Sequence, residues 1–181
     1  MPRLFIAIDL PDVARTAMAQ ACTGIAGARW VKPSQLHLTL RFVGDVSDDA
    51  AAQLQAALDA IRKPRLWLQV KGVGTFPPLG RKPARVLWAG IADNPRLLAL
   101  HDAVSTARPD IGHPPEHAPW VPHITLARFA RKPGPELAAW LKTHAALELP
   151  AIEVSGFHLL KSELRRGGAV HEVARSFELS G

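Results

Sequence analysis

Apolar and polar residues alternate in several short runs along the chain, which is the period of a β-strand with one buried face. In residues 65–73, for example, Leu66, Leu68 and Val70 would share one face of an extended strand. This alternation, together with short apolar runs that end at glycine or proline, predicts strands throughout the chain. We expect them at residues 4–8, 35–43, 65–73, 86–91, 121–129, 151–160 and 169–179.

Longer stretches between these runs are rich in alanine and leucine, and they predict helices. Two of them begin at residues that cap helices well. Ser47 carries a hydroxyl that can accept an N–H of the first turn, and Asn94 precedes a proline. The helices are predicted at residues 11–26, 48–61, 95–107 and 136–146, and residues 161–168 are predicted as a polar turn.

One tetrapeptide pattern occurs twice, as His-Leu-Thr-Leu at residues 37–40 and as His-Ile-Thr-Leu at residues 123–126. Each copy lies in a predicted strand. The histidine and the threonine would therefore share one face, and the two apolar residues would share the other, buried face. Two strands that each present an imidazole and a hydroxyl are best interpreted as two halves of one site.

The order of elements after each copy is similar: a helix, a strand, a basic turn that contains glycine, and another strand. This order predicts a single domain, residues 1–181, built from two lobes of related construction that meet near residue 92. No linker separates the halves. At 181 residues the chain is long enough for two small lobes that share a core.

The two histidines, His37 and His123, indicate acid–base chemistry, since the ordinary pKa of histidine lies near neutral pH. One neutral imidazole can take a proton from an attacking hydroxyl or water while the other, protonated, gives one to a leaving oxygen. Phosphodiester transfer needs such a pair. The hydroxyls of Thr39 and Thr125 could donate hydrogen bonds to the phosphate oxygens.

Two arginines are candidates for binding the phosphate, because the planar guanidinium group matches phosphate geometry. Arg41 lies two residues after Thr39, so strand alternation places it on the histidine face. Arg128 would fall on the opposite face from His123 unless the strand bulges or ends there. Regular alternation therefore favours Arg41 over Arg128.

Charge and cysteine content narrow the possible partners and compartment. Lys and Arg number 22 against 16 Asp and Glu, and the resulting net charge of +6 favours a polyanionic partner such as nucleic acid. The single cysteine excludes an internal disulfide and fits a reducing compartment. No signal peptide is evident, and no apolar run is long enough to span a bilayer, so we expect a cytoplasmic protein.

A metal site is not expected. The proline-rich residues 109–122 spell His113-Pro-Pro-Glu-His117, a spacing that can bind zinc on a helix. Two prolines in the middle make a regular helix there unfavourable. Neither tetrapeptide contains a carboxylate, which argues against a metal-bound water as the nucleophile. We therefore expect no metal and no cofactor.

The repeated tetrapeptide resembles the two H-x-T-x motifs of the 2H phosphoesterase superfamily. Within it the chain is similar to the bacterial and archaeal RNA 2′,3′-cyclic phosphodiesterases, which are also called 2′-5′ RNA ligases. The similar segments cover nearly the whole chain: residues 3–11, 30–33, 41–44, 76–77, 83–90, 127–128 and 162–164, and the proline at position 122.

The resemblance implies an α+β fold with two lobes, in which two antiparallel sheets flank a central cleft and helices lie outside. It also implies metal-independent hydrolysis of a 2′,3′-cyclic phosphate at an RNA or nucleotide end to a 2′-phosphomonoester. In the family the first histidine, His37 here, gives a proton to the departing 3′ oxygen, and the second, His123, activates water. Arg128 corresponds to a family arginine near the phosphate, and is kept as a candidate for that reason.

Two other functions stay open at this point. A relative could instead act on 2′-5′ linkages, by cleaving or joining them, and a rival of another class is a non-catalytic RNA-binding or nucleotide-binding module. We expect a monomer. One departure from the family is visible: His171 stands where relatives often have a tyrosine, and the chain contains no tyrosine.

Overall fold

The strands of the molecule form one large antiparallel sheet and one small one. The structure is a computed structural model, and it describes residues 3–107 and 118–180. The large sheet has the order β10-β9-β1-β3-β7-β6-β5, with β2 also paired to β7, and the small sheet pairs β4 with β8. The strands are β1 (Arg3–Asp9), β2 (Ala28–Trp30), β3 (His37–Asp45), β4 (Leu66–Leu68), β5 (Val70–Phe76), β6 (Val86–Ile91), β7 (His123–Phe129), β8 (Ile152–Val154), β9 (Gly156–Arg165) and β10 (Gly168–Glu178).

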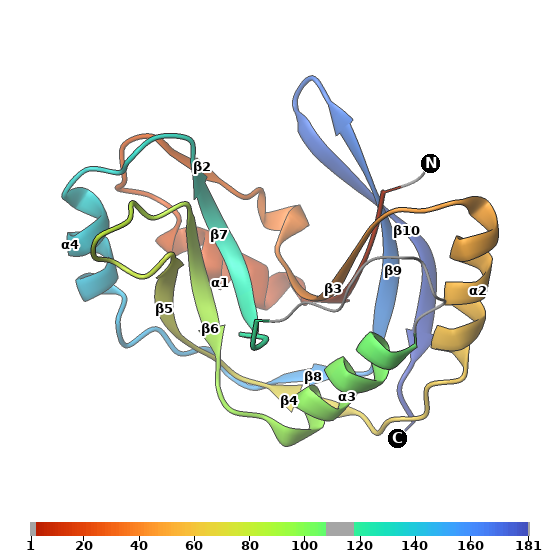
Figure 1. Cartoon of the computed structure of the whole chain (residues 1–181). Coiled ribbons are helices and arrows are strands. Elements are labelled where there is room, and N and C mark those ends of the chain that lie inside the picture. Colours follow the sequence, from red (N-terminus) through yellow and green to blue (C-terminus); the bar gives the residue numbers. More distant parts are fainter. Residues whose placement is uncertain (1–2, 108–117, 181) are drawn as a thin grey trace.

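The helices lie on the outer sides of the sheet (Figure 1). They are α1 (Asp12–Ala21), α2 (Asp48–Asp59), α3 (Pro95–Thr106) and α4 (Glu136–Thr143), and a short 3-10 turn, η1 (Pro33–Gln35), precedes β3. The α+β class is therefore confirmed. Both predicted caps are also confirmed, because Ser47 accepts the N–H of Ala50 and Asn94 accepts that of Leu97. Within the described residues, no helix is long and apolar enough to cross a membrane.

The large sheet has its shortest strand pairing between β3 and β7. In the described structure Leu38 and Ile124 are the one residue pair of that junction. On either side of it the two groups of strands diverge, as Figure 1 shows. One group is β10-β9-β1-β3 and the other is β7-β6-β5 with β2. Each group takes strands from both halves of the chain, so a boundary near residue 92 does not separate them.

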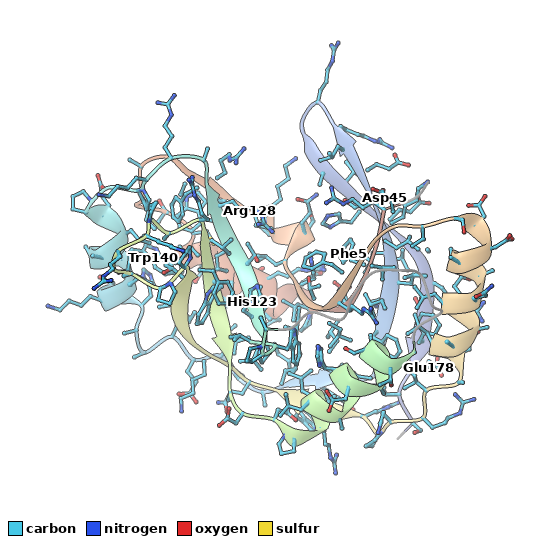
Figure 2. The ribbon with its side chains drawn as sticks, in the orientation of Figure 1. Phe5, Asp45, His123, Arg128, Trp140 and Glu178 are labelled. Atoms are coloured by element: carbon cyan, nitrogen blue, oxygen red, sulfur yellow. The ribbon has the colours of Figure 1, made fainter. Side chains whose placement is uncertain are left out.

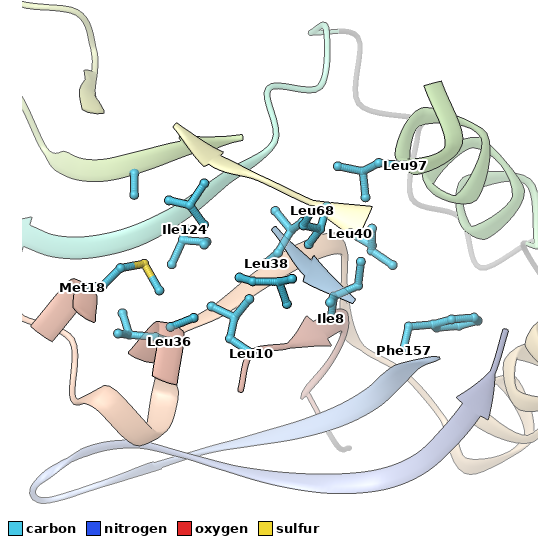
Figure 3. Close-up of a cluster of buried hydrophobic side chains, with 14 of the residues drawn as sticks. Ile8, Leu10, Met18, Leu36, Leu38, Leu40, Leu68, Leu97, Ile124 and Phe157 are labelled. Carbon is cyan, nitrogen blue, oxygen red and sulfur yellow. The ribbon is translucent and has the colours of Figure 1, made fainter. Parts of the chain in front are cut away.

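The apolar residues of both tetrapeptides form the core beneath this junction. Leu38, Leu40, Ile124 and Leu126 are each no more than 1% exposed. Figure 3 shows Leu38 among buried side chains from β1, α1, β4 and α3. Burying a leucine of this kind stabilises the fold by roughly 1.5–3 kcal/mol. The strand face opposite the histidines is thus the one that holds the two groups of strands together.

Several predicted boundaries were wrong. Residues 65–73 and 151–160 were each predicted as one strand, but each is divided between the small sheet and the large one, and the last helix ends at Thr143 and not at residue 146. The first helix ends at Ala21 and not at residue 26, because the chain turns through Gly24 and Gly27, which adopt φ values of +88° and +74°. The predicted turn at residues 161–168 is mostly strand, since β9 continues to Arg165 and pairs with β10. The tip of this hairpin, residues 161–170, projects from the body of the molecule and contains no buried residue (Figure 1).

We expect Leu38→Ala to destabilise the protein by about 2–5 kcal/mol, because it removes a fully buried side chain and leaves a cavity at the junction of β3 and β7. Urea unfolding measures this loss. Val13→Ala is the control, since Val13 is 79% exposed and its truncation should change the unfolding free energy by less than about 0.5 kcal/mol. Equal effects of the two substitutions would contradict the assignment of the core.

Candidate active site

The two groups of strands enclose a cavity of about 500 Å³, and the histidine and threonine of both tetrapeptides line it. The pairing of Leu38 with Ile124 defines an antiparallel register. That register aligns His37 with Thr125 and His123 with Thr39. The cavity therefore has two related halves, each of which contributes one imidazole and one hydroxyl.

Both strands contain a β-bulge at the same position of the pattern. In β3, Ala7 pairs with Thr39 and Ile6 with Arg41, so the ladder skips Leu40. In β7 the ladder skips Leu126 in the same way. An extra residue reverses the alternation of side chains beyond it. As a result, the side chains three residues after each threonine face the cavity, and those two residues after do not.

The bulges reverse what regular alternation predicted for the arginines. The prediction that Arg41 lies on the histidine face was wrong: its Nη1 donates a hydrogen bond to the Ser105 carbonyl of α3 at 2.7 Å. Arg128 lies beyond the second bulge and lines the cavity. Figure 2 shows Arg128 and His123 on the same strand, β7. Phe42 occupies the corresponding position in β3 and also lines the cavity. An alignment of residues 37–42 with residues 123–128 pairs Phe42 with Arg128, so it would have identified Phe42 as a residue of the site.

Each catalytic candidate is held by the main chain just before it. The Nδ1 atom of His37 lies 2.6 Å from the carbonyl oxygen of Gln35, and Nδ1 of His123 lies 2.7 Å from that of Val121. A carbonyl oxygen only accepts hydrogen bonds, so Nδ1 must carry the proton in both rings. This arrangement leaves Nε2 of each histidine to exchange protons with a molecule in the cavity.

Aromatic side chains pack against both imidazoles. The ring of Phe5 lies 5.1 Å from that of His37, and the ring of Phe76 meets that of His123 edge-on at 4.8 Å. Neither Phe5 nor Phe76 could be assigned to the site from the sequence, because a phenylalanine in a strand is usually a core residue. Here the two rings restrict the orientation of the histidines and exclude water from one side of each.

Burial lowers the pKa of both histidines. For His37 the pKa falls to about 4; the hydrogen bond to Gln35 and the charge of Asp9 oppose the fall, and His171 and Arg15 add to it. For His123 burial also lowers the pKa, the hydrogen bond to the Val121 carbonyl raises it, and the charge of Arg128 lowers it. Both imidazoles are therefore mostly neutral at pH 7 while the cavity holds no anion.

The described part of the chain contains no group of three histidine, cysteine, aspartate or glutamate side chains placed to hold a metal ion. The sequence His113-Pro-Pro-Glu-His117 lies outside the described residues. The polar groups that line the cavity are instead mainly imidazoles, hydroxyls and guanidinium groups, all of which suit an anionic ligand that offers oxygen atoms.

The sequence matches one protein family over most of its length. The family model of the 2′-5′ RNA ligase superfamily matches residues 10–166. Several proteins named RNA 2′,3′-cyclic phosphodiesterase are similar over most of their length. That of Aeropyrum pernix is 33% identical, over 88% of this chain and 90% of its own. That of Thermus thermophilus is 34% identical, over 99% of this chain and 91% of its own.

Solved structures agree in fold. The protein TT0787 of Thermus thermophilus superposes with a TM-score of 0.82 at 30% identity, covering 99% of this chain and 98% of that protein. E. coli LigT complexed with 3′-AMP superposes with a TM-score of 0.78 at 28% identity, and both chains are covered completely. The architecture implied by the two H-x-T-x motifs is thus confirmed.

Acid should destabilise the protein through His37. Its pKa is lower in the folded than in the unfolded state, so the unfolded chain binds more protons, and stability is lost as the pH falls from about 6.5 towards 4. We expect this group to contribute about 3 kcal/mol of that loss, measured by urea unfolding at several pH values. His37→Asn, whose amide can still donate to the Gln35 carbonyl, should lack this component. His158→Asn, at the exposed contact with Ser176, should retain it.

Proposed function

The chain belongs to the 2′-5′ RNA ligase superfamily, and we propose that it hydrolyses the 2′,3′-cyclic phosphate at the end of an RNA or nucleotide to a 2′-phosphomonoester. One observation carries the proposal: two histidines and two threonines from separate strands line a single cavity together with Arg128. The relatives named RNA 2′,3′-cyclic phosphodiesterase support the same reaction.

In the proposed reaction, Nε2 of His123 takes a proton from water as the water oxygen attacks phosphorus. The bond from phosphorus to the 3′ oxygen then breaks, and Nε2 of His37 gives its proton to that oxygen. The products are a 2′-phosphomonoester and a free 3′ hydroxyl. The family resemblance, and not the geometry, supplies the direction of these roles, and in the reverse, joining direction the two histidines would exchange them.

Charge that develops on the phosphate oxygens needs hydrogen-bond donors that are already in place. The hydroxyls of Thr39 and Thr125 and the guanidinium group of Arg128 line the cavity and supply such donors. Arg128 also brings the positive charge that an anionic ligand requires. We assign these three residues to phosphate binding.

The substrate itself would promote the proton uptake that the reaction needs. Both histidines have lowered pKa values in the empty cavity, so both are mostly neutral at pH 7. A bound cyclic phosphate brings a negative charge, which favours the protonated form of a neighbouring imidazole. Substrate binding is therefore coupled to proton uptake, and one histidine becomes an acid while the other remains a base.

The proposal includes a cytoplasmic monomer that needs no metal and no cofactor. A non-catalytic binding module is the weaker candidate, because binding alone would not require two imidazoles with Nδ1 held by the main chain and Nε2 left available. Activity on 2′-5′ linkages uses the same groups, and it is separated from the proposed reaction by the choice of substrate.

Replacing either His37 or His123 should strongly reduce turnover. We expect His37→Ala and His123→Ala to lower kcat by a factor of about 10²–10⁴ on a short RNA that ends in a 2′,3′-cyclic phosphate, with excess EDTA present. The product should be the 2′-phosphate, resolved from the 3′-phosphate by chromatography. His158→Ala, outside the cavity, should retain activity. If the unaltered protein binds this RNA without cleaving it, the binding module becomes the better account, and joining of 2′-5′ ends would favour the ligase.

Substitutions of the two arginines should have different effects on kcat/KM. Arg128→Ala should lower kcat/KM by roughly 10- to 100-fold, since it removes the cation that faces the phosphate. Arg41→Ala is the matched control from the equivalent strand; it should reduce the midpoint of thermal unfolding but leave kcat/KM within about threefold of the unaltered value, a change of less than roughly 1 kcal/mol. A larger loss of kcat/KM for Arg41→Ala than for Arg128→Ala would contradict the bulged register.

A further inference from the structure

A third histidine lines the cavity, and the two-histidine reaction does not use it. His171 lies in β10, on the hairpin that forms the wall beside His37. Its ring meets that of Phe5 at 4.8 Å and that of His37 at 5.5 Å, both nearly edge-on. Phe5, labelled in Figure 2, thus contacts the imidazoles of His37 and His171.

Gln35 connects the segment that carries His171 to His37 by two hydrogen bonds. The side-chain amide of Gln35 donates a hydrogen bond to the carbonyl of Ala169, two residues before His171 in β10. The main-chain carbonyl of the same Gln35 accepts the Nδ1 proton of His37. Gln35 therefore ties the hairpin to the strand that carries the first catalytic candidate, although the two segments are far apart in the sequence.

The ring nitrogens of His171 make no hydrogen bond to any other residue of the described structure. The side chain is half-buried, and burial lowers its pKa. These ring nitrogens are not among the fully buried polar atoms of the described residues that lack a partner, so they still reach solvent in the cavity. A ligand can replace that solvent and supply the hydrogen bond. The nitrogens are thus available to an oxygen atom of a molecule in the cavity.

We propose that His171 is a substrate-contacting residue that hydrogen-bonds the nucleotide end beside His37, and that its charge opposes the protonation of His37. The inference rests on the proposed function and adds a third imidazole to it. Oxygen atoms of the phosphate and of the ribose are the groups that an imidazole N–H or lone pair would meet there.

Few charged groups act on this pair of imidazoles. Arg3 of β1 lines the same cavity, and Asp9 and Arg15 act on His37. On β9 the residue paired with His171 is Ser162, which is neutral. A positive charge on His171 therefore makes it harder to protonate His37. Removing that charge should make His37 easier to protonate.

The test compares His171→Phe and His171→Gln with the unaltered protein, using hydrolysis of 2′,3′-cyclic AMP over a pH range from about 3 to 9, which includes the lowered pKa of His37. Phenylalanine keeps the packing against Phe5 but removes both nitrogens, so we expect KM to rise roughly tenfold. Glutamine restores a neutral hydrogen-bonding group and should recover most of that KM. In both variants the limb of the pH profile of kcat/KM that reports the protonation of His37 should move to higher pH, by about half a unit or more.

A purely structural role would lower kcat/KM without moving either limb, and an unmoved profile in both variants would overturn the inference. His158→Phe, on the same hairpin outside the cavity, is the control and should leave both limbs in place. If the unaltered protein turns over only the short RNA that ends in a 2′,3′-cyclic phosphate, the same comparison is made on that RNA. If it turns over neither substrate, the proposed function fails and not this inference alone. Circular dichroism of His171→Phe and His171→Gln would distinguish a folding defect from an altered site.

Discussion

The pairing of Leu38 with Ile124 is the constraint on which the rest of the structure depends. It joins two groups of strands at their edges, with the apolar face buried beneath the junction, and the opposite faces diverge around a cavity. Because each of the paired residues follows a histidine and precedes a threonine, one register aligns both halves of the site. The same two strands thus provide the core and the chemistry, on opposite faces.

The bulges after each threonine give the site its electrostatic character. Without them Arg41 would face the cavity and Arg128 would not; with them the two walls present Phe42 and Arg128 at corresponding positions. The walls are related in backbone but differ in chemistry. A cyclic phosphodiester also has two different sides, since one bond to phosphorus forms while another breaks, and a site with identical walls would not distinguish them.

Much of this arrangement could be predicted from local patterns. Strand alternation placed the histidines and threonines on one face, and the caps at Ser47 and Asn94 marked helix starts correctly. The bulges could not be predicted, because Leu40 and Leu126 are apolar residues that suit a regular strand equally well. The bond from Gln35 to Ala169 joins segments that are distant in sequence, and no periodicity reports such a contact.

The positive charge of the protein and the neutrality of its buried histidines belong to one mechanism. A net charge of +6 attracts anionic ligands from a distance, but burial favours the neutral form of both imidazoles while the cavity holds no anion. A site that held a protonated His37 permanently would have to bury that charge, and the charge of Asp9 and the hydrogen bond to Gln35 only partly offset the cost of its burial. In the proposed reaction the bound substrate provides a further partner and reduces this cost, so that His37 becomes an acid only when a phosphate is present in the cavity.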